Sequence, residues 1–130
     1  MTKEEAREQA LGALYASDVL GRDFIDTVRI SKRAGELAEG VWVRREAIDV
    51  AIDAASRDWR IERMSAVDRN ILRLATYELL YTDLPKGIAM DQAVELAKRY
   101  STAKSGAFVN GVLGAIADTG IRMPEARPEH

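Results

Sequence analysis

The sequence of 130 residues contains no cysteine, one histidine and only three prolines. The lack of cysteine excludes disulfides, thiolate nucleophiles and cysteine-based zinc sites, and it suits a reducing compartment. No apolar run approaches the roughly 18 residues of a membrane-spanning helix, and the N-terminus lacks the layout of a signal peptide. We therefore expect a cytoplasmic protein that does not bind membranes.

Few residues could support catalysis. The single histidine, His130, ends a tail with two prolines, where a catalytic base is not expected. No glycine-rich phosphate-binding loop is found in the sequence. Glu78 could be a general base, but a half-buried carboxylate more often accepts structural hydrogen bonds. We predict that the protein is not an enzyme and that it holds no metal ion or cofactor.

Apolar residues recur at spacings of three and four, which is typical of amphipathic helices. We predict an all-α fold, a compact bundle of about six to seven helices. The expected helices span residues 3–20, 26–40, 44–57, 65–82, 90–100 and 108–117. We expect one domain over residues 1–120, with sub-bundles of about 1–57 and 58–120 and a disordered tail at 121–130.

Residue types at the starts of two segments support these helices. Thr2 and Glu5 fit a capping box before the first helix, and Ser65 and Asp68 fit another before the fourth. In the third helix, Asp49 is expected to face water.

Two further features suggest close packing. Trp59 lies in a connector and is expected to anchor the two sub-bundles to each other. Gly106, Gly111 and Gly114 lie in the last helix, where each glycine costs about 1 kcal/mol relative to alanine. We therefore expect a neighbouring backbone to approach them closely.

The formal net charge of −2 argues against a protein that holds nucleic acid by bulk electrostatics. The charge is uneven, because residues 57–104 carry nine basic and seven acidic side chains, whereas residues 1–56 carry eight and eleven. A polyanion site should therefore draw on the middle of the chain, although charge alone favours ordinary solvated helix faces. The cations concerned are Arg57, Arg60, Arg63, Arg69, Arg73, Lys98, Arg99 and Lys104.

A few residues are of the kinds that recognise single-stranded RNA. Such RNA is bound by stacking on aromatic rings, by hydrogen bonds to base edges and by cations on phosphates. Tyr15, Phe108, Asn110 and Lys104 supply these groups. Taken alone, they favour the plainer interpretation that the two aromatic residues belong to the core and that Asn110 is a polar group at a helix end.

Three motifs follow one another between residues 71 and 113: LRLATYELL, DQAVELAK and FVNGVL. In this order, and with AREQALGALYASD near the N-terminus, they resemble the NusB family of bacterial transcription antitermination factors. The resemblance implies a helical, non-enzymatic adaptor that binds boxA-type ribosomal RNA leader sequence. It also implies a partner, the small-subunit ribosomal protein NusE, and a role in the transcription elongation complex.

Carried over by position, the resemblance assigns two surfaces. The RNA-binding residues would be Lys3, Arg7, Tyr15, Lys104, Phe108 and Asn110. The surface that faces NusE would comprise Glu62, Asp68, Arg69 and Arg73.

The sequence departs from the family pattern at its N-terminus, where family members carry a cluster of arginines. Here the segment TKEEAREQA has one lysine, one arginine and three glutamates. Because each lost phosphate contact removes salt-dependent affinity, RNA binding is expected to be weak without NusE. Smaller departures are Asp91-Gln92 before AVELAK and Gly114 after FVNGVL, where asparagine-glutamate and aspartate are usual.

Three functions are compatible with these observations. The first is an antitermination factor that binds boxA-type RNA together with NusE. The second is a protein-interaction module that binds NusE, or itself as a homodimer, with little or no RNA binding. The third is a detached accessory module that resembles the NusB-like domain of some ribosomal RNA methyltransferases.

Overall fold

The computed structural model describes residues 2–57 and 59–119. The regular structure of this part of the chain consists of six α-helices and one short 3-10 helix, so the all-α prediction is confirmed. The helices are α1 (Lys3–Val19), α2 (Lys32–Val43), α3 (Arg45–Ala55), η1 (Ile61–Arg63), α4 (Ala66–Tyr81), α5 (Lys86–Tyr100) and α6 (Ser105–Ala117).

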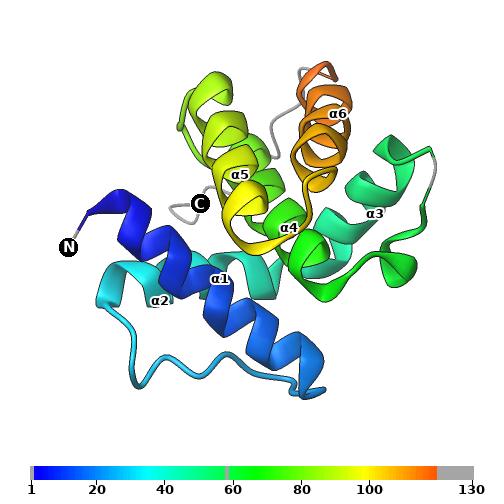
Figure 1. The fold of residues 1–130 in the computed structure, drawn as a ribbon. Coiled ribbons are helices and arrows are strands. Elements are labelled where there is room, and N and C mark those ends of the chain that lie inside the picture. The colour runs from blue at the N-terminus through cyan, green and yellow to red at the C-terminus, as the bar shows by residue number, and fades with distance from the viewer. Residues whose placement is uncertain (1, 58, 120–130) are drawn as a thin grey trace.

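Helix α4 lies at the centre, and each of the other α-helices packs against it (Figure 1). Its apolar side chains cover more than one face, and Ile71, Leu72 and Leu74 are at most 1% exposed. Such a helix gains its stability from burial on all sides rather than from one amphipathic stripe.

The remaining helices form two groups around α4. Helices α1 and α2 pack together on one side, and α5 and α6 pack together on another (Figure 1). Helix α3 packs against α4 and α6, which places it with the C-terminal helices rather than with α1. A division into sub-bundles at Trp59 therefore does not follow the helix packing, and the single domain over 1–120 stays a prediction.

The predicted cap of α1 is present in full. The Thr2 hydroxyl accepts a hydrogen bond from the Glu5 amide at 3.1 Å, and the Glu5 carboxylate accepts one from the Thr2 amide at 2.7 Å. Only half of the second predicted box forms. The Ser65 hydroxyl accepts from the Asp68 amide at 3.1 Å, while the Asp68 carboxylate is used elsewhere.

Helix α2 begins later than predicted, at Lys32 rather than residue 26. The Asp26 carboxylate accepts a hydrogen bond from the Val28 amide at 3.0 Å, which favours a local turn over a helix. Val28, an apolar residue of this segment, is 87% exposed. The helix starts where the Ser31 hydroxyl caps the Ala34 amide at 3.1 Å.

The last two helices begin earlier than predicted. Pro85 is the N-cap of α5, so Gly87 lies in the first helical turn. A proline is tolerated there because the first amides of a helix lack intrahelical partners. Helix α6 starts at Ser105 rather than residue 108, and Ser105 itself is buried rather than acting as the N-cap.

Trp59 is not the expected anchor, because it is 54% exposed. The buried tryptophan is Trp42 on α2, which is 8% exposed and carries the Arg45 guanidinium 3.9 Å above its ring. Asp49 also differs from expectation, since its carboxylate binds Arg73 on α4.

The glycines of α6 do not mark a close backbone approach. A Cβ at Gly111 would meet no atom within 4 Å, and one at Gly106 or Gly114 would meet side chains at 3.6 and 3.8 Å. The tight position is Gly40 on α2, where a Cβ would lie 2.4 Å from the Tyr77 hydroxyl oxygen. A glycine is therefore required at position 40, where α2 packs against the Tyr77 side chain of α4. The glycines of α6 are not required by a backbone contact.

The tail predicted to be disordered at 121–130 and the residue His130 lie outside the described residues. Among the helices that the structure describes, none has the length and hydropathy to cross a membrane.

Candidate RNA interface

A hydrogen-bonded ridge joins the first turn of α4 to the end of α5 and the start of α6. The Asp68 carboxylate accepts hydrogen bonds from the Ser101 hydroxyl at 2.7 Å and from the Ser105 hydroxyl at 3.0 Å. The two serine hydroxyl oxygens lie 2.8 Å apart. We call Asp68, Ser101 and Ser105 the Asp68 ridge. It fixes where the residues on both of its sides project.

On one side of the ridge lies a cavity of about 260 Å³. Two aromatic rings, Trp59 and Phe108, and two cations, Arg63 and Lys104, line it together with Asp68 and Ser105 of the ridge. Trp59, Arg63 and Lys104 are exposed, and Phe108 is half-buried against the core. Aromatic faces beside cations are the groups that single-stranded nucleic acid requires, because every base has a face to stack and a phosphate to neutralise. We call this the Trp59–Phe108 cavity.

The structure therefore brings two of the six predicted RNA residues, Lys104 and Phe108, into one site. Tyr15 is 40% exposed and lines a different groove, between α1 and α5. Asn110 is exposed on α6 and does not line the Trp59–Phe108 cavity.

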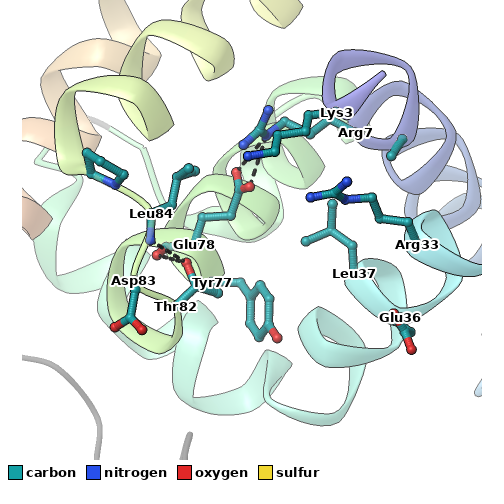
Figure 2. A pocket seen from close by; sticks show the side chains of 12 residues that line it. Lys3, Arg7, Arg33, Glu36, Leu37, Tyr77, Glu78, Thr82, Asp83 and Leu84 are labelled. Atoms are coloured by element: carbon teal, nitrogen blue, oxygen red, sulfur yellow. Dashed lines mark hydrogen bonds and ion pairs between the residues drawn. The ribbon is translucent and has the colours of Figure 1, made fainter. Parts of the chain in front are cut away.

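Lys3 and Arg7 lie apart from that site, in a cavity of about 510 Å³ between α1, α2 and the end of α4. Arg7 donates from Nε to both carboxylate oxygens of Glu78, at 2.9 and 3.2 Å. Figure 2 shows Lys3 and Arg33 extending toward this pair. Arg7 is only 6% exposed, so its prediction as a phosphate contact conflicts with a buried structural ion pair.

Glu78 has the structural role that its position suggests, although its partner is an arginine on another helix. Burial raises the pKa of Glu78, while the charge of Arg7 and its hydrogen bonds act in the opposite direction. An ion pair in this setting ties α1 to α4, because either charge alone would be costly to bury.

The predicted partner surface is divided by the fold. Glu62 on η1 is exposed, and its carboxylate lies 3.7 Å from the Arg60 guanidinium. The Asp68 carboxylate accepts the hydrogen bonds from the two serine hydroxyls of the ridge. Arg69 and Arg73, predicted to face NusE, are instead turned into the protein, where their side chains are 16% and 11% exposed.

The two arginines belong to a network that joins three helices. The Asp18 carboxylate on α1 accepts hydrogen bonds from Arg69 Nε and Asn70 Nδ2, both at 2.8 Å. Arg73 binds the Asp49 carboxylate on α3 through two hydrogen bonds of 2.8 Å. Bidentate pairing of this kind fixes the guanidinium in one orientation. The network holds α1, α3 and α4 in register and leaves only a small part of either arginine side chain exposed.

The network also affects the pKa of the Asp18 carboxyl. Burial acts to raise the pKa of its carboxyl, but the hydrogen bonds from Arg69 and Asn70 and the charges of both arginines outweigh burial. The pKa of Asp18 is therefore lower than usual.

Sequence reasoning included Arg63 only among the mid-chain cations and interpreted Trp59 as an anchor, and it assigned neither residue to the RNA surface. The available signal was an aromatic residue in a connector rich in charged residues, directly before the capped start of α4. Within residues 2–57 and 59–119, no group of three or more histidines or carboxylates is placed to hold a metal ion.

Comparison with known proteins agrees with the fold and with the motifs. The model of the NusB family matches residues 4–118. The transcription antitermination protein NusB of Anaeromyxobacter dehalogenans strain 2CP-1 is 43% identical and aligns with 96% of this chain and 94% of its own length. The NusB protein of Trichlorobacter lovleyi is 46% identical over 85% of this chain and 87% of its own length.

Solved structures show the same arrangement of helices. A solved structure of T. maritima NusB has a TM-score of 0.80 and 34% identity, and the match covers 100% of this chain and 99% of that one. A crystal structure of the antitermination factors NusB and NusE in complex with dsRNA has a TM-score of 0.76 and 29% identity, over 90% of this chain and 96% of that one. The curated relatives are antitermination proteins rather than enzymes, which confirms the prediction of a non-enzymatic protein. This chain belongs to the NusB family.

Proposed function

We propose that the protein is a transcription antitermination factor that binds boxA-type single-stranded RNA together with NusE, in the cytoplasm and as part of a transcription elongation complex. The observation that supports this most directly is the Trp59–Phe108 cavity, where aromatic rings and cations surround the end of the Asp68 ridge. A similar solved structure contains NusB and NusE in complex with dsRNA, which supports NusE and an RNA as partners.

The formal charge of the chain is consistent with dependence on a partner. With a net charge of −2, the protein gains little from bulk attraction to RNA, so affinity must come from local contacts and from NusE. We propose that the contacts to RNA include Lys104 and Phe108, with Arg63 and Trp59 added to them. Lys3, Tyr15 and Asn110 remain proposed contacts outside this cavity.

The proposed surface for NusE is narrower than the sequence suggested. Glu62 is the member of the predicted set whose carboxylate is open to a partner, since its side chain is 68% exposed. We propose that η1 carries this contact. Arg69 and Arg73 support it only by holding α4 in place.

A titration tests the proposal. Fluorescence anisotropy of labelled boxA-type RNA is followed with the protein alone, with NusE alone and with both. We expect weak binding by the protein alone and clearly tighter binding by both. Binding of NusE without any RNA binding would instead support the protein-interaction module, and no binding of either would refute the antitermination role.

Two variants locate the site. Lys104→Ala should weaken RNA binding and lower the slope of affinity against salt by about 0.7, the value for one phosphate contact to a single strand. Lys32→Ala is the matched control, because Lys32 is an exposed lysine on α2, which contributes no residue to the Trp59–Phe108 cavity. Equal effects of the two changes would show that lysine charge acts without a defined site.

A further inference from the structure

An apolar groove lies between α3 and the C-terminal ends of α4 and α6, two helices that pack against α3 (Figure 1). It has a volume of about 280 Å³. Its apolar lining consists of Ala51, Ala54, Ala55, Leu80, Ala115 and Ile116. We call it the α3–α6 groove.

Helix α3 is apolar on more than its buried side. Ile52 is fully buried, but Val50 is 70% exposed, and Ala47 and Ala54 are also exposed. Residues 47, 50, 51 and 54 recur at spacings of three and four, so they lie on one face of the helix. This exposed apolar face is continuous with the groove, because Ala51 and Ala54 belong to both.

The carboxylates of α3 beyond its first turn bind other parts of the protein. Asp49 binds Arg73 on α4 through two hydrogen bonds of 2.8 Å. Asp53 accepts a hydrogen bond from the Ile61 amide at 2.7 Å. The polar groups of α3 thus stabilise its packing, and its outer face is suited to cover by another apolar segment.

The chain itself leaves from the rim of the groove. Thr119, where the described residues end, is part of the lining, and its hydroxyl donates to the Ile116 carbonyl at 2.8 Å. The residues that follow read GIRMPEARPEH and include two large apolar side chains, Ile121 and Met123. The six residues from Thr119 to Glu125 can span about 20 Å, which is more than a groove of this volume requires.

The order of residues in this segment matches the groove. In an extended segment, alternate side chains lie on the same face, which places Ile121, Met123 and Glu125 together. Pro124 favours the extended conformation at Met123, because a proline disfavours the helical region for the residue before it. The pattern is thus two apolar side chains followed by one carboxylate.

A cation for that carboxylate lies on the rim. Arg57 is exposed and is the charged residue among those that line the groove. Within the part of the chain that the structure describes, no hydrogen bond or ion pair engages its side chain. The groove therefore offers an apolar floor and one positive charge, which complements the segment.

We propose that residues 120–130 bind in the α3–α6 groove, with Ile121 and Met123 on its apolar floor and the Glu125 carboxylate at Arg57. The segment then joins α6 to α3 and covers the apolar face of α3. Because it is tethered at the rim, its effective concentration at the groove is on the order of millimolar, which favours it over a free segment of equal affinity. The inference is independent of the proposed function, since the groove shares no lining residue with the Trp59–Phe108 cavity.

The first test measures where the segment lies. The sequence has no cysteine, so Arg127→Cys gives the full chain a single site for a nitroxide spin label. The oxidised label should broaden the amide signals of Ala51, Ala54 and Ala115, compared with the reduced label, and should leave those of α1 sharp. Broadening that is absent from α3 and α6 would overturn the proposal.

The second test removes the apolar contacts from either side. In the labelled chain, Ile121→Asp combined with Met123→Asp should abolish the broadening, and so should Ala54→Glu in the groove. Ala107→Glu is the matched control, because Ala107 is an exposed alanine at the other end of α6 and should have no effect. Unchanged amide signals of α1 show that each variant is folded. Broadening that survives both changes contradicts the docking.

The third test exchanges the two charges. Arg57→Glu or Glu125→Arg alone should lower the ratio of bound to free segment by about 1.4-fold to fivefold, as expected for a surface ion pair. The double change should restore the ratio. A double change that weakens binding as much as the two single changes together would refute the pairing of Glu125 with Arg57.

A second copy of the chain is the competing occupant of the groove. Sedimentation equilibrium of the unmodified protein and of Ala54→Glu should give the same mass. A dimer that dissociates on Ala54→Glu, and that persists when Ile121→Asp is combined with Met123→Asp, would overturn the proposal and assign the groove to a contact between copies.

Discussion

Arg7 on α1 and Glu78 on α4 form an ion pair across 71 residues of sequence, with Nε of the arginine 2.9 Å from the nearer carboxylate oxygen. The two side chains are 7% and 8% exposed. An arginine that the family pattern assigns to phosphate binding is thus used here to attach the first helix to the central one. Any loss of RNA binding on changing Arg7 must be separated from loss of the fold.

The pair should behave as a coupled unit in stability measurements. Arg7→Met alone should lower the free energy of unfolding by about 3–5 kcal/mol, because it leaves Glu78 buried without its counter-charge. The double change Arg7→Met with Glu78→Leu should cost much less than the two single changes together. Urea unfolding followed by circular dichroism measures all four proteins, and simple additivity would contradict the coupling.

Acidification provides a check on the same pair. Burial raises the pKa of Glu78, and loss of Arg7 removes the group that opposes this rise. In Arg7→Met, Glu78 can therefore be buried as the neutral acid at low pH. The destabilisation by Arg7→Met should shrink as the pH is lowered from neutrality toward the raised pKa.

Asp18 should show the opposite dependence. Its pKa is lower in the folded protein, where hydrogen bonds from Arg69 and Asn70 outweigh burial. The stabilisation that it provides is present above the unfolded pKa of about 3.9 and is lost as the pH falls through the folded value. Asp18→Asn should cost about 1.5–3 kcal/mol at neutral pH, since it weakens hydrogen bonds between charged groups.

Unfolding of the unmodified protein and of Asp18→Asn, measured at several pH values, tests this pH dependence. The difference in unfolding free energy between the unmodified protein and Asp18→Asn should narrow below about pH 4. If the difference in unfolding free energy stays constant down to strong acid, the Asp18 charge contributes nothing to the packing of α1 against α4.

Two glycines should respond to alanine in opposite ways. Gly111→Ala should raise the free energy of unfolding by about 0.5–1 kcal/mol, because it stiffens α6 and its Cβ meets no atom within 4 Å. Gly40→Ala should lower the melting temperature, because its Cβ would lie 2.4 Å from the Tyr77 hydroxyl oxygen. The Tyr77 ring is stacked on Tyr81 with centroids 5.9 Å apart, so moving it disturbs a second ring. A stabilising Gly40→Ala would contradict this packing.

The helices that could be predicted well are those with local signals at their ends. The cap formed by Thr2 and Glu5 sets the start of α1, and Ser65 sets the start of α4. The start of α2 was misplaced because Asp26 favours a turn that periodicity cannot detect. The start of α5 was misplaced because proline is common both in connections and at the first positions of a helix. Pro85 therefore does not distinguish the two from sequence.

The site was harder to predict because an arginine on a half-apolar helix has the same local pattern whether it binds phosphate or a carboxylate. Glu78, the partner of Arg7, lies 71 residues away in the sequence. Asp49 on α3, the partner of Arg73, lies 24 residues away. Only the packing of helices decides between these roles. Lys104 and Phe108 line one cavity because they lie four residues apart at the start of α6, where sequence spacing determines position.

The partner surface should respond at Glu62 rather than inside α4. Glu62→Lys reverses an exposed charge on η1 and should slow association with NusE, with a larger effect at low salt than at high salt. Surface plasmon resonance with immobilised NusE measures both rates. Glu39→Lys is the matched control, because it reverses an exposed charge on α2.

The same experiment with Asp68→Lys separates a partner contact from a structural role. Asp68→Lys removes the acceptors of the Ser101 and Ser105 hydroxyls, so it should lower the melting temperature as well as NusE binding. Glu62→Lys should leave the melting temperature unchanged. If Glu62→Lys binds NusE like the unmodified protein, η1 is not part of the partner surface, and the effect of Asp68→Lys is that of a broken ridge.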